Sequence, residues 1–193
     1  IDWKLYGRTD ELYVKQFETE RNLTVHLLVD ASGSMRFGEG ETNKFEYAAK
    51  IGIGFAYLAV AENNDFRFAV FGEDYDRLDA GRSNRGEVMR LVDRCNETTP
   101  DGTADYAGAL SAYAATIGSR SLVVVVSDFL DEVESIQAGL LPLSNHELIL
   151  PQVLAPAELD PPVYGDTIFR EIESALRRRT YFGSRLRERY RDR

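Results

Sequence analysis

The chain has 193 residues, of which 44% are hydrophobic and 28% are charged, and its formal net charge is −9. These values suit one soluble α/β-sized domain with a substantial core, and no apolar stretch approaches the length of a membrane span. The single cysteine, Cys95, excludes an internal disulfide and is expected to be a plain structural thiol.

The first half of the chain predicts a buried strand, a long helix and a hairpin. Residues 23–29 (LTVHLLV) are nearly all apolar, as in a strand that is buried on both faces. Residues 44–61 place small and aromatic side chains on one stripe, which predicts a helix packed on a sheet. Residues 66–80 (FRFAVFGEDYDRLDA) predict two short strands around Gly72-Glu73-Asp74.

The second half continues the alternation of helices and strands. We expect helices over 84–95, 104–117 and 131–141, and strands over 121–126 and 146–154, the last bent at Pro151. We expect 161–169 (PPVYGDTIF) to form a last edge strand and a helix to end the chain. Together these elements predict a Rossmann-like, doubly wound α/β fold. Its central sheet is mostly parallel, with helices on both faces and one antiparallel edge strand.

The charge is distributed unevenly along the chain. Residues 170–193 hold nine arginines and four acids, a charge of +5, which leaves −14 for the rest. An acidic body argues against nucleic-acid binding there. The tail could contact nucleic acid or anionic lipid, but such a run more often forms the solvated face of a helix, and Tyr181, Leu186 and Tyr190 recur at near-helical spacing. We therefore expect no nucleic-acid partner and no membrane contact of this chain.

Oxygen-bearing side chains follow two of the predicted strands. Asp30, Ser32 and Ser34 come directly after strand 23–29, and Asp128 follows strand 121–126. In open α/β sheets, ligands bind beyond the carboxyl ends of strands, where the strand order reverses. Thr103 stands at a helix start, and Gly102 before it lets that loop approach closely. We therefore expect these five side chains to meet in one crevice.

The donor set predicts the cation. Two carboxylates and three hydroxyls are hard oxygen ligands without sulfur or imidazole, which suits Mg²⁺ or Mn²⁺. They would leave coordination positions open for water or for an acidic group from a partner. Alone, Asp-x-Ser-x-Ser is a weak signal, because Asp and Ser are ordinary turn formers after a strand.

Two enzymatic readings compete with a binding site. A serine hydrolase would need a Gly-x-Ser-x-Gly elbow and a base, whereas "ASGSM" lacks the elbow and His26 and His146 both lie within predicted strands. A phosphotransferase using Asp30 as nucleophile would need a second carboxylate where Ser32 stands. A divalent-metal-dependent hydrolase or phosphotransferase remains the alternative to a module without turnover.

The motifs "DASGS", "DGT" and "SD" together resemble the metal-ion-dependent adhesion site of von Willebrand factor A domains. The resemblance implies that Ser32, Ser34 and often Thr103 contact the metal, while Asp30 and Asp128 act through water or serine hydroxyls. Asp101 departs from the pattern, because many members have glycine there. An extra carboxylate at this outer position would tighten cation binding or weaken the acceptance of an acidic ligand.

The N-terminal stretch narrows the resemblance. Ile1-Asp2-Trp3, Leu12-Tyr13-Val14-Lys15 and Glu18-Thr19-Glu20 resemble the lead-in of a prokaryotic subfamily of unknown biochemical function. Its members are commonly encoded beside MoxR-type AAA+ ATPases. The resemblance implies a lead-in over 1–22, one von Willebrand A-like unit over 23–193, and a fragment of a longer protein.

These features lead to one expected function. We expect a cytoplasmic, metal-dependent protein-interaction module whose partner offers an acidic side chain, by resemblance a MoxR-type ATPase or its client. An upstream membrane anchor in the full-length protein is compatible with this expectation.

Overall fold

A five-stranded sheet forms the centre of the computed structural model, which describes residues 23–38, 43–159, 165–170 and 177–182. Its strands are β1 (Thr24–Asp30), β2 (Asp65–Phe71), β3 (Tyr75–Arg77), β4 (Leu122–Val126) and β5 (Glu147–Ile149), in the order β3-β2-β1-β4-β5. β1 is parallel to β2 and β4, β5 is parallel to β4, and only β3 at the edge is antiparallel. The predicted fold class is confirmed.

The register brings the carboxyl ends of β1 and β4 together. Val29 lies between Val70 of β2 and Val126 of β4, so β1 is central. The chain proceeds from β1 to β2 on one side and later to β4 on the other, which makes the β1–β4 boundary the point of strand-order reversal. Asp30 and Asp128 therefore leave the sheet as neighbours.

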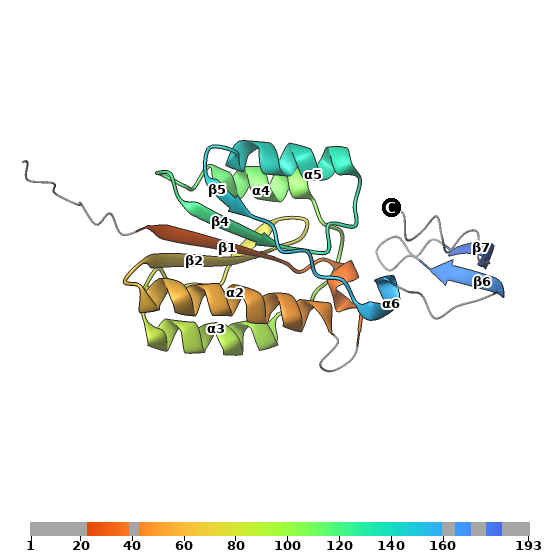
Figure 1. The fold of residues 1–193 in the computed structure, drawn as a ribbon, viewed down its shortest axis with the longest axis horizontal. Coiled ribbons are helices and arrows are strands. Elements are labelled where there is room, and N and C mark those ends of the chain that lie inside the picture. The colour runs from red at the N-terminus through yellow and green to blue at the C-terminus, as the bar shows by residue number, and fades with distance from the viewer. Residues whose placement is uncertain (1–22, 39–42, 160–164, 171–176, 183–193) are drawn as a thin grey trace, which may run out of the picture.

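Helices cover both faces of the sheet (Figure 1). α2 (Lys44–Ala61) and α3 (Arg85–Glu97) lie on one face, and α4 (Tyr106–Ala114) and α5 (Val133–Leu140) lie on the other. Side chains at the N-caps define three of the starts. Asn43 accepts a hydrogen bond from the backbone N–H of Glu46 at 3.0 Å, and Asn84 and Asp105 cap α3 and α4 in the same way.

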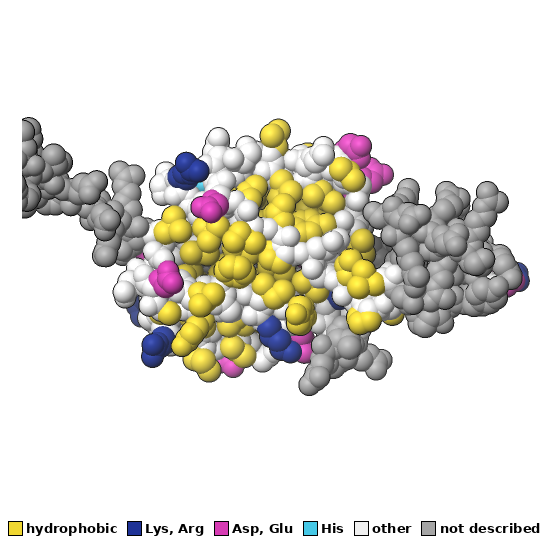
Figure 2. All heavy atoms as spheres, in the orientation of Figure 1, with side chains coloured by type: hydrophobic (Ala, Val, Ile, Leu, Met, Phe, Trp, Pro, Cys, Tyr) yellow, Lys and Arg dark blue, Asp and Glu magenta, His cyan; other side chains and the backbone are white. Residues whose placement is uncertain are grey.

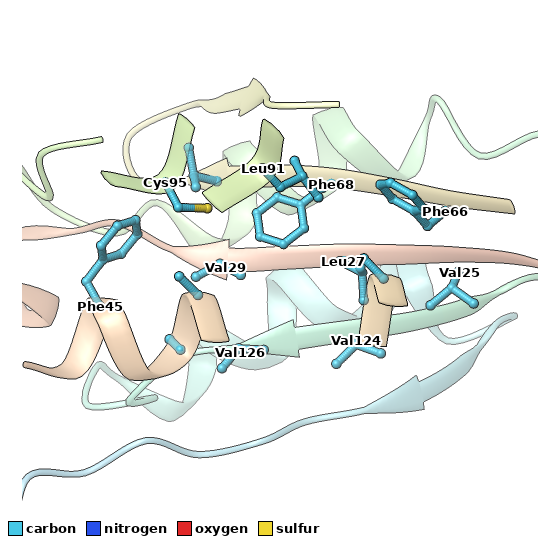
Figure 3. Close-up of a cluster of buried hydrophobic side chains, with 14 of the residues drawn as sticks. Val25, Leu27, Val29, Phe45, Phe66, Phe68, Leu91, Cys95, Val124 and Val126 are labelled. Atoms are coloured by element: carbon cyan, nitrogen blue, oxygen red, sulfur yellow. The ribbon is translucent and has the colours of Figure 1, made fainter. Parts of the chain in front are cut away.

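The apolar residues that predicted the strands form the core. Figure 3 shows side chains of β1, β2 and β4 facing those of α2 and α3. Cys95 of α3 lies in this cluster, and burial raises the pKa of its thiol to about 11, which agrees with a structural role. The labelled members of the cluster are Val25, Leu27, Val29, Phe45, Phe66, Phe68, Leu91, Cys95, Val124 and Val126.

Two expectations about the C-terminal part were wrong. β6 (Gly165–Arg170) does not join the central sheet, because it pairs antiparallel with β7 (Arg177–Phe182) in a separate two-stranded sheet. The arginine run at 177–179 is therefore strand, not helix. It continues into Thr180, Tyr181 and Phe182, and β-branched and aromatic residues of this kind prefer strands. The lead-in 1–22 and the tail 183–193 lie outside the described residues.

Hydrophobic side chains also gather on one outer face (Figure 2). Exposed hydrophobic side chains of the described residues include Tyr47, Tyr57 and Leu58 of α2 and Ile149 and Leu150 near β5. Within the described part of the chain, no helix is both long and apolar enough to cross a membrane. The oxygen-bearing residues lie elsewhere, at the carboxyl ends of β1 and β4.

Candidate metal site

Asp30 ends β1 as a fully buried carboxylate whose hydrogen-bond partners are neutral. One oxygen accepts the backbone N–H of Ser32 at 2.8 Å; the other accepts the hydroxyls of Ser127 at 2.6 Å and Tyr106 at 3.3 Å. Burial raises the pKa of Asp30, and the negative charge of Asp128 adds to this, although the bonds from Ser127 and Ser32 oppose it. Among the described residues, Asp30 has no basic side chain paired with it.

The two serines lie on the loop that follows β1. Ser32 is buried and Ser34 is half-buried in the short 3-10 helix η1 (Gly33–Arg36). Their hydroxyl oxygens are 3.1 Å apart and share a hydrogen bond, so the two side chains lie next to each other. The structure thus brings together the three residues of the Asp-x-Ser-x-Ser motif.

Backbone hydrogen bonds tie the loop of Thr103 to the serine loop. The N–H of Gly33 donates to the carbonyl of Gly102 at 2.9 Å, and the N–H of Asp101 donates to the carbonyl of Ala31 at 2.9 Å. Gly102 has φ of +68°, a left-handed conformation that favours glycine, as the close approach of this loop requires. Thr103 is exposed next to this junction, but it does not begin a helix as expected, because α4 starts at Tyr106 and Asp105 caps it. Its contact with a cation stays a prediction.

Asp128 is held differently from Asp30. Its Oδ2 accepts a hydrogen bond from the buried ammonium of Lys44 at 2.7 Å, and its Oδ1 accepts the backbone N–H of Leu130 at 3.1 Å. Lys44 also contacts Glu158 of α6 (Pro156–Leu159), at 2.7 Å. Both oxygens of Asp128 are thus engaged, and its charge is balanced by a residue that we did not predict.

The backbone after Asp128 is strained. Phe129 has φ of +49°, which is unusual for a bulky residue and costs about 1–3 kcal/mol. Its N–H donates to the Ser127 hydroxyl at 3.0 Å, and its ring stacks on Tyr106 at a centroid distance of 6.2 Å. These contacts hold the Ser127–Asp128–Phe129 turn, and with it the hydroxyl that donates to Asp30.

Asp101 is paired outside the group of five. Its exposed carboxylate lies 3.1 Å from the guanidinium of Arg36, whose Nε also donates to the carbonyl of Pro100 at 2.8 Å. This ion pair reduces the charge that Asp101 offers to a nearby cation. Its outer role around a metal stays a prediction.

The donor set fits a hard cation without forming a closed cage. No three His, Cys, Asp or Glu side chains of the described residues form a group that could hold a metal ion. The candidate set relies on hydroxyls instead, with a buried carboxylate that lacks a positive partner, and oxygen donors of this kind suit Mg²⁺ or Mn²⁺. The set consists of Asp30, Ser32, Ser34, Thr103 and Asp128.

Sequence reasoning missed four residues that organise this site. Tyr106 and Ser127 support Asp30, Arg36 pairs with Asp101, and Lys44 pairs with Asp128. One signal was available for Lys44. It occupies the first position of α2, where the helix dipole disfavours a cation, so a specific partner for it was to be expected.

Comparison with known proteins supports the fold. The family model described as "Protein of unknown function DUF58" matches residues 1–193. Uncharacterised proteins of Mycobacterium tuberculosis and Mycobacterium bovis are each 25% identical over 191 residues, which cover 97% of this chain and 60% of the relative. The chain thus spans about three-fifths of the length of these relatives.

Three solved structures share the architecture. An aerotolerance-related membrane protein from Bacteroides fragilis has a TM-score of 0.55 at 18% identity, covering 88% of this chain and 87% of that one. BatB from Bacteroides thetaiotaomicron has 0.56 at 16%, covering 88% and 85%. The manganese-loaded TRAP protein of Plasmodium vivax has 0.52 at 19%, covering 68% and 57%. The chain therefore has a von Willebrand A-like fold and belongs to the DUF58 family of proteins of unknown function.

Proposed function

We propose that this chain is a protein-interaction module that binds its partner through a divalent cation. The observation that carries the proposal is Asp30, a fully buried carboxylate whose hydrogen-bond donors among the described residues are all neutral. Burying such a charge is costly unless a positive charge balances it. Mg²⁺ or Mn²⁺ at the adjacent serine loop would supply that charge.

The neutral and the charged residues of the site would have different roles. Ser32, Ser34 and Thr103 would hold the cation with neutral hydroxyls, and Asp30 and Asp128 would act on it through water and the serines. The cation would supply a directional bond to a carboxylate of the partner, because neutral ligands leave it most of its charge. A structural neighbour with the same fold, the Plasmodium vivax TRAP protein, is manganese-loaded, which supports the choice of ion.

The two histidines lie away from this site, which supports a role without turnover. His26 lies in the middle of β1, where its Nδ1 shares a hydrogen bond with the Tyr113 hydroxyl at 2.9 Å. His146 lies before β5, at the opposite end of the parallel strands, and its Nδ1 accepts the N–H of Ser121 at 3.3 Å. Neither imidazole is placed to serve as a base for a hydroxyl of the serine loop.

We infer that the partner is a MoxR-type AAA+ ATPase or a client that it remodels. This inference rests on the resemblance to a subfamily encoded beside such ATPases, together with a site suited to an acidic ligand. The acidic side chain would come from the partner, because the hydroxyl set itself leaves coordination positions open.

One titration tests the proposal. The ATPase is titrated against wild type, Ser32→Ala and Ser119→Ala, each in Mg²⁺ and in EDTA. Ser119 is an exposed serine before β4, so its variant controls for loss of a hydroxyl elsewhere. We expect binding only in Mg²⁺, and only for wild type and Ser119→Ala. Equal affinity in all conditions would show that the site is not the docking point.

A further inference from the structure

Lys44 is buried in an unfavourable place for a cation. Its side chain is 1% exposed, and it is the first residue of α2, where the positive end of the helix dipole repels it. Its backbone N–H donates to the carbonyl of Phe37, so it also joins the serine loop to the helix. A buried ammonium at such a position requires strong compensation.

Two carboxylates provide that compensation. The ammonium lies 2.7 Å from Asp128 Oδ2 and 2.7 Å from Glu158 Oε1. The other oxygen of Glu158 accepts the N–H of Ala155 at 2.8 Å, a local bond at the start of α6. The Lys44–Glu158 contact links α6 to α2 at the end of the sheet where β1 and β4 end (Figure 1). The three side chains carry a formal net charge of −1 in total. The ammonium of Lys44 therefore links the Asp128 and Glu158 carboxylates.

We propose that Lys44 is a positioning residue that sets how tightly the site holds its divalent cation. Its ammonium occupies one oxygen of Asp128, which keeps that carboxylate from contacting the metal directly. Asp128 is then shared between two positive charges. This proposal rests on the metal site of the proposed function and goes beyond it, because it assigns the affinity of that site to a residue outside the group of five.

Sharing Asp128 has a consequence for the partner. If the cation received the full charge of both aspartates, its attraction for a further carboxylate would fall, since like charges repel across a site of low dielectric. Lys44 engages Oδ2 of Asp128 without adding a metal ligand, so less of that carboxylate is available to the cation. The cation is therefore held weakly and keeps charge for an acidic group of the partner.

A pair of substitutions separates this role from a merely structural one. Lys44→Met with Glu158→Gln removes one positive and one negative charge, so the net charge of the group stays at −1 while Asp128 becomes free. Lys50→Met serves as the matched control, because Lys50 is an exposed lysine of the same helix whose ion pair is with Glu46 at 3.9 Å. Calorimetric titration with MgCl₂ measures affinity, and thermal unfolding in EDTA verifies that each variant is folded.

We expect the double variant to bind Mg²⁺ about tenfold more tightly than wild type, because the ammonium no longer occupies Oδ2 of Asp128 while the net charge of the group is unchanged. Lys50→Met should bind as wild type does. If the double variant does not fold, Lys44→Gln with Glu158→Gln replaces it, since the amide can still donate to Asp128 without a charge.

The outcomes distinguish this proposal from the metal site itself. Equal affinity of wild type and a folded double variant would overturn the role of Lys44 and leave the metal site in place. Weaker binding by the double variant would also overturn it, because Lys44 would then support the cation. Absence of Mg²⁺ binding in every protein would overturn both.

Discussion

β1 and β4 end side by side, each followed by a buried aspartate, yet the two carboxylates are stabilised in opposite ways. Asp128 has the ammonium of Lys44 at 2.7 Å, whereas Asp30 has two hydroxyls and one backbone N–H. On the β4 side, Asp128 has a cationic partner within the chain, although Lys44, Asp128 and Glu158 together keep a formal net charge of −1. On the β1 side, Asp30 pairs with no basic side chain of the described residues, and under the proposed function a divalent cation next to it would supply the balancing charge.

The sharpest test of this contrast replaces each aspartate by asparagine. Asp128→Asn leaves the buried Lys44 with Glu158 alone, and we expect a loss of about 3 kcal/mol in the free energy of unfolding. Asp30→Asn removes a buried charge that pairs with no basic side chain in the described part of the chain, so the metal-free protein should become more stable at neutral pH. Urea unfolding in EDTA measures both. Two changes of the same sign would contradict the contrast.

β1 also buries a second titratable group, His26, which lies in the middle of the strand and away from the serine loop. Burial and the charge of Arg67 lower the pKa of His26 from 6.5 to about 4. The unfolded chain therefore binds more protons between these values, so the stability from neutral His26 is complete above pH 6.5. It is lost as the pH falls to about 4, by about 3 kcal/mol in total.

His26→Asn should remove most of this pH dependence. Asparagine can keep the hydrogen bond to the Tyr113 hydroxyl, which now spans 2.9 Å, but it does not titrate. The measurement is the difference in unfolding free energy between wild type and variant at several pH values from 7 to 4. Curves that stay parallel over this range would show that His26 is not the titrating group.

The hydrogen bond from the Tyr106 hydroxyl to Asp30 also depends on close packing between α4 and α5. A Cβ added at Gly139 of α5 would lie 2.3 Å from the carbonyl oxygen of Tyr106, so Gly139→Ala must displace α4. We expect a loss of about 2 kcal/mol from overpacking, together with weaker Mg²⁺ binding as the Tyr106 hydroxyl moves from Asp30. Gly54→Ala is the control, because its Cβ would meet no atom within 4 Å. Thermal unfolding and Mg²⁺ titration of both variants measure the effect.

The smallest expected change comes from Ser127→Ala. It removes the 2.6 Å hydrogen bond to Asp30, and we expect a loss of about 1 kcal/mol in unfolding free energy. It should also raise the pKa of Asp30 further, because that bond favours the charged form. Urea unfolding of wild type and variant in EDTA measures the loss. An unchanged stability would mean that Ser127 does not support Asp30.

The sequence predicted the sheet because its strands are local patterns. The helix expected over 44–61 is observed over Lys44–Ala61, since an apolar stripe and the Asn43 cap both define it. Ligands in open α/β sheets bind beyond the carboxyl ends of strands where the strand order reverses, and this rule placed Asp30 next to the strand that leads to Asp128. The C-terminal hairpin was missed, because an arginine run has no period that separates a strand from a helix, and only the pairing of β6 with β7 decides it.

The residues that support the two aspartates were missed for the same reason, because only the tertiary fold brings them together. Lys44 is 84 residues from Asp128 and 114 from Glu158, so no local pattern connects them. Ser127 and Tyr106 likewise meet Asp30 only through the tertiary fold. The oxygen-bearing side chains of the candidate metal site could be recognised in the sequence as a motif, whereas the residues that support them or balance their charge could not.

The most direct test of the central claim is the stability of wild type and Ser32→Ala in Mg²⁺ and in EDTA. The metal-free protein should fold, because its core does not depend on the five oxygen side chains. Mg²⁺ at about a hundredfold excess over its dissociation constant should stabilise wild type by about 2.7 kcal/mol and leave Ser32→Ala unchanged. A wild-type melting temperature that is the same in millimolar Mg²⁺ and in EDTA would contradict a metal site beside Asp30.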